Sequence, residues 1–204
     1  MKGRLLRLSA LIEQRNQLDA EIAGLIDAPA QPAYLAEFIA RVVFEIQPRE
    51  GRDQRRIDGH FSNGRLAGRT VAVRWYPRQT DVLDIPAIWQ PDYLLAFSGP
   101  CLDGDQNSRP WVIEAAYLFD TRALVHKLKR FGQAPGVAVP LNSETWRAAE
   151  IYPRAYSPLL RLTPEQGQLL ALFAGEAVDE RAAVSSPAGS RTRPAAPGVS
   201  ARSG

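Results

Sequence analysis

The segment from residue 35 to residue 76 most constrains the fold of this chain, because its apolar spacing changes there from the period of a helix to that of a strand. Apolar residues at three- and four-residue intervals predict a well-buried helix over residues 33–46, and one acid, Glu37, lies beside this stripe. Over residues 70–76, large apolar side chains alternate with smaller or polar ones, which predicts a strand.

Two further strands are predicted beside residues 70–76. Residues 56–61 predict a short strand that carries Asp58, and Asn63-Gly64 predicts the tight turn that would pair it with residues 70–76. The continuous apolar run at residues 93–97 suits a central strand, which has both faces covered.

The second half of the chain alternates between strand and helix signals. The predicted elements are a strand at 111–119, a helix at 122–131, an edge strand at 136–140, a short helix that Asn142 or Ser143 caps and that carries Trp146 and Ile151, and a final helix that the capping box Thr163-Pro164-Glu165-Gln166 opens and that ends near Gly175. These patterns predict an α/β fold, or an α+β fold, in which helices flank one mixed central sheet.

Both ends of the chain differ from the middle. Residues 4–26 have apolar side chains at helical spacing, so we expect an amphipathic helix that lies on the domain's own core. The alternative is a short dimerising coiled coil, against which Arg15 argues because it interrupts the stripe. From residue 176 onward large apolar residues are scarce, which predicts a disordered tail. We therefore expect an N-terminal helix at 1–30, a domain at 31–175 and a tail at 176–204.

The composition excludes several classes of protein. The 45% hydrophobic and 23% charged fractions are typical of a soluble globular protein, and a net charge of +3 is only mildly basic. One cysteine, Cys101, excludes an internal disulfide, and no Cys/His cluster predicts a zinc site. No apolar run is long enough for a bilayer, and no P-loop or dinucleotide fingerprint is present. We expect a cytoplasmic protein without membrane or nucleotide-cofactor partners.

One group of residues has the chemistry of a metal-assisted site. Asp58, Ala72 and Arg74 fall on adjacent predicted strands, and the side chains of residues 72 and 74 point to the same face. Glu37, on a helix packed on that sheet, is placed to reach the same region. Two neighbouring carboxylates favour Mg²⁺, and a nearby cation would stabilise charge on a phosphate. Asp58, Glu37 and Arg74 are thus the predicted catalytic residues, with Asp58 and Glu37 as the metal ligands.

This layout resembles the PD-(D/E)XK superfamily, the restriction-endonuclease-like nucleases, over about residues 31–131, and it is also similar to a family of uncharacterised bacterial proteins. In that resemblance Glu37 matches the helix acid, Asp58 the first motif aspartate and Arg74 the motif lysine. The resemblance implies a restriction-endonuclease-like core, Mg²⁺ and DNA cleavage. Two departures matter. Ala72 replaces the second strand acid, and an arginine cannot lose its proton to help activate water.

The arginines around these residues suggest a phosphate-binding surface, because a guanidinium matches the geometry of a phosphate. The candidates for nucleic-acid contact are Arg56, Arg69, Arg74 and Arg78. The alternative is an ordinary solvated rim, since Glu50 and Asp53 are interspersed with further arginines. The sequence therefore predicts a nuclease-like protein that binds DNA, in an active or a catalytically silent form. The alternative function is a non-enzymatic protein-interaction module, and a homodimer is a further expected assembly.

Overall fold

The computed structural model describes residues 2–49, 57–78, 81–88, 90–100 and 111–175. Arg56, Cys101 and the predicted tail at 176–204 lie outside the described residues. In chain order the elements are α1 (Lys2–Ile26), α2 (Pro32–Phe44), β1 (Ile46–Pro48), β2 (Gly59–Phe61), the 3₁₀ turn η1 (Gly64–Leu66), β3 (Thr70–Tyr76), β4 (Val82–Leu83), β5 (Tyr93–Ser98), β6 (Ala115–Asp120), α3 (Thr121–Arg130), β7 (Val139–Pro140), α4 (Ser143–Ala149), β8 (Glu150–Tyr152) and α5 (Pro164–Ala171).

A mixed sheet forms the centre of the domain, which confirms the predicted fold class. Its strand order is β1-β2-β3-β5-β6-β8, and β3 and β5 run parallel whereas the other neighbours are antiparallel. The predicted central strand β5 lies between β3 and β6 and is buried over most of its length. β4 and β7 pair separately as a small antiparallel sheet.

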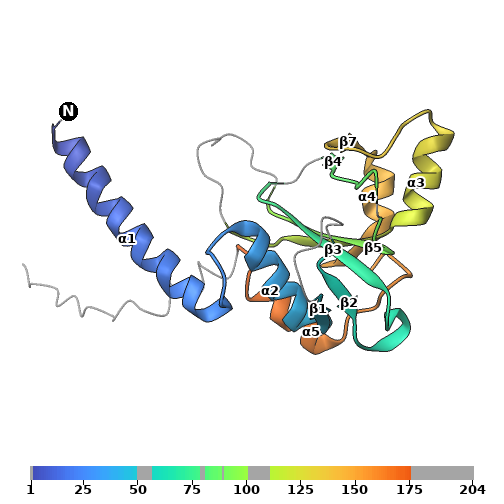
Figure 1. Ribbon diagram of the computed structural model, residues 1–204, viewed down its shortest axis with the longest axis horizontal. Helices are drawn as coiled ribbons and strands as arrows, with labels where there is room; N and C mark the ends of the chain where they lie inside the picture. Colours follow the sequence, from blue (N-terminus) through green and yellow to red (C-terminus); the bar gives the residue numbers. More distant parts are fainter. Residues whose placement is uncertain (1, 50–56, 79–80, 89, 101–110, 176–204) are drawn as a thin grey trace, which may run out of the picture.

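Helices cover both faces of this sheet (Figure 1). On one face, α2 and α5 cover Val71, Val73 and Phe97, together with the other apolar side chains of that core. On the other face, α3 and α4 pack over Ala72, Leu94 and the rest of a second core. Because side chains alternate along a strand, Arg74 and Tyr76 belong to the same face as Ala72. The sheet therefore separates the helix that carries Glu37 from the side of β3 that carries Arg74.

Local signals explain where most helices begin. Pro32 occupies the first turn of α2, where a missing N–H costs nothing, and Glu45 ends this helix at φ 51°. Asp120 caps α3 and Asn142 caps α4, each by accepting a backbone N–H three residues ahead. Thr163 and Gln166 form the predicted capping box of α5. The capping chemistry was therefore predicted correctly, although α5 ends at Ala171 rather than near Gly175.

Several predicted boundaries were wrong. Gly64 opens a 3₁₀ turn instead of closing a two-residue hairpin, so the connection from β2 to β3 is longer than predicted. Ile151 lies in the edge strand β8 and not in the helix that carries Trp146. The strand predicted at 111–119 begins only at Ala115, and the one at 136–140 is reduced to β7. Each correction falls at an element of two to seven residues, too short for its period to be read from sequence.

The helix α1 does not lie on the domain's core, and that prediction was wrong. It projects from the rest of the fold, and its residues 3–18 are all exposed (Figure 1). Only its C-terminal turns meet the domain, where Ile26 is buried. α2 and α5 already cover that face of the sheet. None of the described helices, α1 included, combines the length and the apolar composition that crossing a bilayer requires.

Candidate functional site

The carboxylate of Asp58 lies at the edge of β3. Asp58 precedes β2, and its backbone N–H donates to the carbonyl of Val71 at 2.9 Å. Its Oδ2 accepts the backbone N–H of Val73 at 2.6 Å and lies 3.5 Å from Nη1 of Arg74. The side chain thus occupies the position that the next residue of a longer β2 would fill. Asp58 satisfies a backbone donor that the short strand leaves without a partner.

Arg74 is held beside Asp58 by the same strand. Its Nη1 donates to the carbonyl of Val73 at 2.6 Å as well as contacting Asp58. The side chains of Arg74 and Asp58 are 18% and 19% exposed, so the pair is largely shielded from water. Burial raises the pKa of Asp58, and the Val73 N–H and the Arg74 charge oppose that shift without cancelling it. The structure therefore brings two of the three predicted catalytic residues together, as an ion pair that binds back onto its own strand.

The raised pKa of Asp58 predicts how the stability of the fold depends on pH, and Asp92 provides a matched control. A carboxyl with a raised pKa stabilises the fold fully below its ordinary value of 3.8, and this stabilisation is lost as the pH rises through the raised pKa. Asp58→Asn should therefore gain stability relative to the wild type as the pH rises above 3.8. Urea unfolding across the acidic range up to neutrality measures the difference.

Asp92 should show the opposite sign. Burial alone would raise its pKa, but the N–H and hydroxyl of Thr70, with Arg69, outweigh burial and lower it. Its stabilisation is present above the ordinary carboxyl pKa and is lost as the pH falls through the lowered value. Asp92→Asn should therefore lose stability relative to the wild type as the pH rises towards 3.8. The same slope in both variants would contradict the burial of Asp58.

The other predicted metal ligand, Glu37, is less well placed. Glu37 lies half-buried on α2, on the opposite face of the sheet from Arg74. Ala72 is fully buried in the core beneath α3 and α4. Asp84, which follows β4, accepts the N–H of Ala138 with its Oδ1 at 2.8 Å. Among the described residues no group of three or more His, Cys, Asp or Glu side chains surrounds a common point. This donor set fits Mg²⁺ poorly, because Asp58 is already engaged by an arginine.

Three of the predicted nucleic-acid arginines, Arg69, Arg74 and Arg78, lie within the described residues and are spread along β3. Arg69 precedes β3 and pairs with Asp92 at 3.3 Å, whereas Arg78 follows the C-terminal end of the same strand. At about 3.3 Å per residue, nine residues of extended chain separate the two by roughly 30 Å. Arg74 lies between them and is turned towards Asp58. Two of these three arginines, Arg69 and Arg74, are therefore already engaged by carboxylates.

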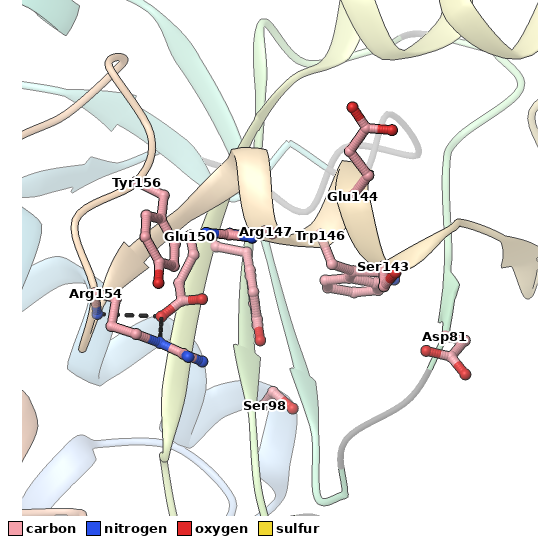
Figure 2. Close-up of a pocket in the computed structure, with 10 residues that line it drawn as sticks. Asp81, Ser98, Ser143, Glu144, Trp146, Arg147, Glu150, Arg154 and Tyr156 are labelled. Carbon is pink, nitrogen blue, oxygen red and sulfur yellow. Dashed lines mark hydrogen bonds and ion pairs between the residues drawn. The ribbon is translucent and has the colours of Figure 1, made fainter.

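A larger polar feature lies on the face of the sheet that also carries Arg74. A cavity of about 610 Å³ opens between α4 and the sheet, near the C-terminal end of β5. Its lining includes Ser98 from β5 and Trp146 from α4 (Figure 2). Tyr117 from β6 also lines it. The carboxyl ends of parallel strands are a frequent place for ligands in mixed α/β sheets. Its size falls within the usual range of ligand sites.

Charged groups line one side of this cavity. Glu150, only 3% exposed, accepts hydrogen bonds from Nε of Arg154 at 3.0 Å and from its backbone N–H at 3.1 Å (Figure 2). The guanidinium of Arg147 stacks on the ring of Tyr156, with 4.7 Å between its carbon and the ring centre. Glu144 points away from these groups in Figure 2. Arg154 neutralises Glu150, so Arg147 is the cation that has no carboxylate partner within the described part of this cavity.

Aromatic donors complete the lining. The indole N–H of Trp146 is buried and has no hydrogen-bond partner among the described residues. The ring of Trp146 packs edge-on against Tyr117 with 4.8 Å between ring centres. Burial, with the charge of Glu150, raises the pKa of Tyr117 against the opposing effect of Arg154, so its hydroxyl remains a neutral donor at neutral pH. An arginine, a tyrosine hydroxyl and aromatic rings together suit a ligand that has both an anionic group and a flat ring.

Comparisons with protein-family models, with curated proteins and with solved structures find no match to this chain.

This cavity could not be predicted from the sequence. Arg147, Glu150 and Arg154 were not singled out, because residues 147–154 cross from α4 into β8 and share neither the period of a helix nor that of a strand. The available signal was the density of charged and aromatic residues between Trp146 and Tyr156. Without the pairing of β6 with β8, that density does not distinguish a cavity wall from a solvated loop.

Proposed function

We propose that this protein binds single-stranded DNA without cleaving it, and that the cavity beneath α4 receives one nucleotide. The observation that carries the proposal is Arg147, an exposed guanidinium stacked on Tyr156 at the mouth of an aromatic-lined cavity. Arginine binds phosphate in a bidentate geometry, and aromatic side chains stack on bases regardless of sequence. A base within a duplex is already stacked and paired, so an unpaired nucleotide is the better fit.

The resemblance to PD-(D/E)XK nucleases supports the nucleic-acid part of this proposal and not the catalytic part. Asp58 is bonded to Val73 and Arg74, and the acid expected two residues before the basic position is Ala72. Arg74 keeps a positive charge but cannot act as a general base. A binding protein without catalytic activity could keep the pair of Asp58 and Arg74 and would not need the acid that Ala72 replaces. In this proposal Mg²⁺ has no required role.

Binding is tested by fluorescence anisotropy with labelled single-stranded and duplex oligonucleotides. We expect tighter binding of single strands, and affinity that falls steeply with salt because phosphate contacts release counterions. Arg147→Ala should weaken binding by about tenfold or more, since it removes both a phosphate contact and a stacking platform. Arg130→Ala on α3, also exposed and basic, is the matched control and should leave affinity within about twofold.

Two results would overturn the proposal. Equal losses in Arg147→Ala and Arg130→Ala would show that only net charge matters and that the cavity has no role. Cleavage of plasmid or linear DNA with Mg²⁺ or Mn²⁺, if abolished by Asp58→Asn, would establish an active nuclease instead.

A second function, that of a protein-interaction module, is favoured by α1. This helix exposes large apolar side chains far from the cavity, at positions where a monomer gains nothing from them. Interaction through α1 is compatible with DNA binding, because the two surfaces belong to different elements.

A further inference from the structure

The exposed face of α1 carries a regular apolar stripe. Large apolar residues that are at least 44% exposed occur along the helix at Leu5, Leu6, Leu8, Leu11, Ile12, Leu18 and Leu25. An isolated helix of this length gains little stability from propensity alone and depends on packing of its apolar face. Monomers rarely expose so large an apolar surface without a partner for it.

The spacing of the stripe is that of a coiled coil. Leu8, Leu11, Arg15, Leu18, Ile22 and Leu25 follow one another at alternating intervals of three and four residues. This alternation is the a and d pattern of a heptad repeat, with Arg15 at one a position. All the seam positions between residues 8 and 25 except Arg15 are apolar, so the seam continues on both sides of Arg15.

A groove beside this seam offers room for a second helix. It lies between α1 and the start of α2, and its apolar lining includes Leu11, Leu18 and Ile22 from α1 with Pro32 and Trp111 from the domain. Trp111 is 37% exposed at its rim. A helix laid along α1 would therefore bury the seam and part of the domain surface together.

The charges along α1 indicate which second helix would fit beside it. From Gly3 to Arg15 the helix carries three arginines and one glutamate, whereas from Asn16 to Ile26 it carries two acids and no cation. An antiparallel copy of the same helix places the basic half of each against the acidic half of the other. A parallel copy would set like charges together, which is destabilising.

We propose that α1 is a homodimerisation helix that pairs antiparallel with α1 of a second copy of this chain. In the register that superimposes the two seams, Leu8 lies opposite Leu25 of the second copy and Leu11 lies opposite its Ile22. Arg15 then lies opposite Leu18 of the second copy and beside its Asp19. In a parallel pair the two Arg15 side chains would instead face each other across the seam.

Arg15 already pairs with Asp19 within its own helix. It forms an ion pair with Asp19 one turn ahead at 3.5 Å, with side chains 75% and 35% exposed. In the antiparallel pair Asp19 of either copy can accept the guanidinium at the rim of the seam. A charged residue at one a position specifies register and orientation at some cost in stability.

The first test measures mass by sedimentation equilibrium with the full chain at micromolar concentrations. We expect a dimer for the wild type, and a monomer for Leu11→Glu/Leu18→Glu, whose affinity should fall by about 100-fold or more because four carboxylates enter the seam. Ala20→Glu is the matched control, since Ala20 lies on the opposite side of α1 and is exposed. Circular dichroism melting checks that each variant keeps its folded domain.

The second test distinguishes the two orientations by disulfide trapping in a Cys101→Ser background. Leu8→Cys and Leu25→Cys are made as separate chains of different size, mixed and oxidised. The antiparallel pair gives only the mixed disulfide, and Ala20→Cys, facing outward, gives none. A monomeric wild type would overturn the proposal, and so would disulfides between identical chains.

Discussion

Gly59→Ala is expected to destabilise the domain by about 3 kcal/mol, since overpacking against backbone cannot relax by a change of rotamer. A Cβ at Gly59 would overlap the carbonyl oxygen of Gln47 and lie 2.6 Å from Cγ2 of Ile46. Both obstacles belong to β1, which pairs with β2 across this position. The glycine is therefore required by the close approach of two strands. Urea denaturation followed by tryptophan fluorescence measures the loss.

Gly136→Ala is the control for that experiment. A Cβ at Gly136 meets nothing within 4 Å, and this glycine is not among those with positive φ. The substitution should be neutral or slightly stabilising, because alanine reduces the freedom of the unfolded chain. If Gly59→Ala proved as stable as Gly136→Ala, β1 could not lie where it is placed beside β2.

Asp58→Ala should cost about 2 to 3 kcal/mol, the range expected when a shielded donor and a shielded cation lose their acceptor together. The substitution leaves the N–H of Val73 without its 2.6 Å acceptor and removes the partner of Arg74 at 3.5 Å. The loss should appear as a lower denaturation midpoint with an unchanged slope.

Asp58→Asn separates the structural role of this residue from a catalytic one. An asparagine keeps an oxygen that can accept the N–H of Val73, so it should lose less stability than Asp58→Ala at neutral pH. It removes the negative charge that a metal would need. Equal losses in the two variants would show that the ion pair with Arg74, rather than the backbone hydrogen bond, dominates.

The regular parts of the fold were predictable because their periods are long enough to be unambiguous. The buried stripe of α2, the alternation in β3 and the apolar run of β5 each determine an element and the faces that it covers. What could not be predicted is the face on which each helix packs. The helix that carries Glu37 and the side chain of Arg74 lie on opposite faces of the sheet. This placement depends on the order of β2, β3 and β5 in the sheet, and strand order is not a local property of the sequence.

The candidate site was predicted only in part, for the same reason. Asp58 and Arg74 meet because β2 pairs with β3, as the hairpin prediction required, although the connection itself differs. The cavity depends on three contributions that are distant in sequence, from Ser98, Tyr117 and the segment that contains Arg147. None of these carries a local motif, so only the packed sheet identifies them as one surface. The amphipathic pattern of α1 likewise predicted a helix but not the partner for its apolar face.

The two outer strands limit how this protein can aggregate. β1 and β8 form the edges of the central sheet, and each is only three residues long. Pro48 ends β1 and Pro153 follows β8, and proline has no N–H to donate to an added strand. Short edges that contain or adjoin proline protect a sheet against the addition of strands from other molecules. Extension of the central sheet by a strand of another molecule is therefore unfavourable.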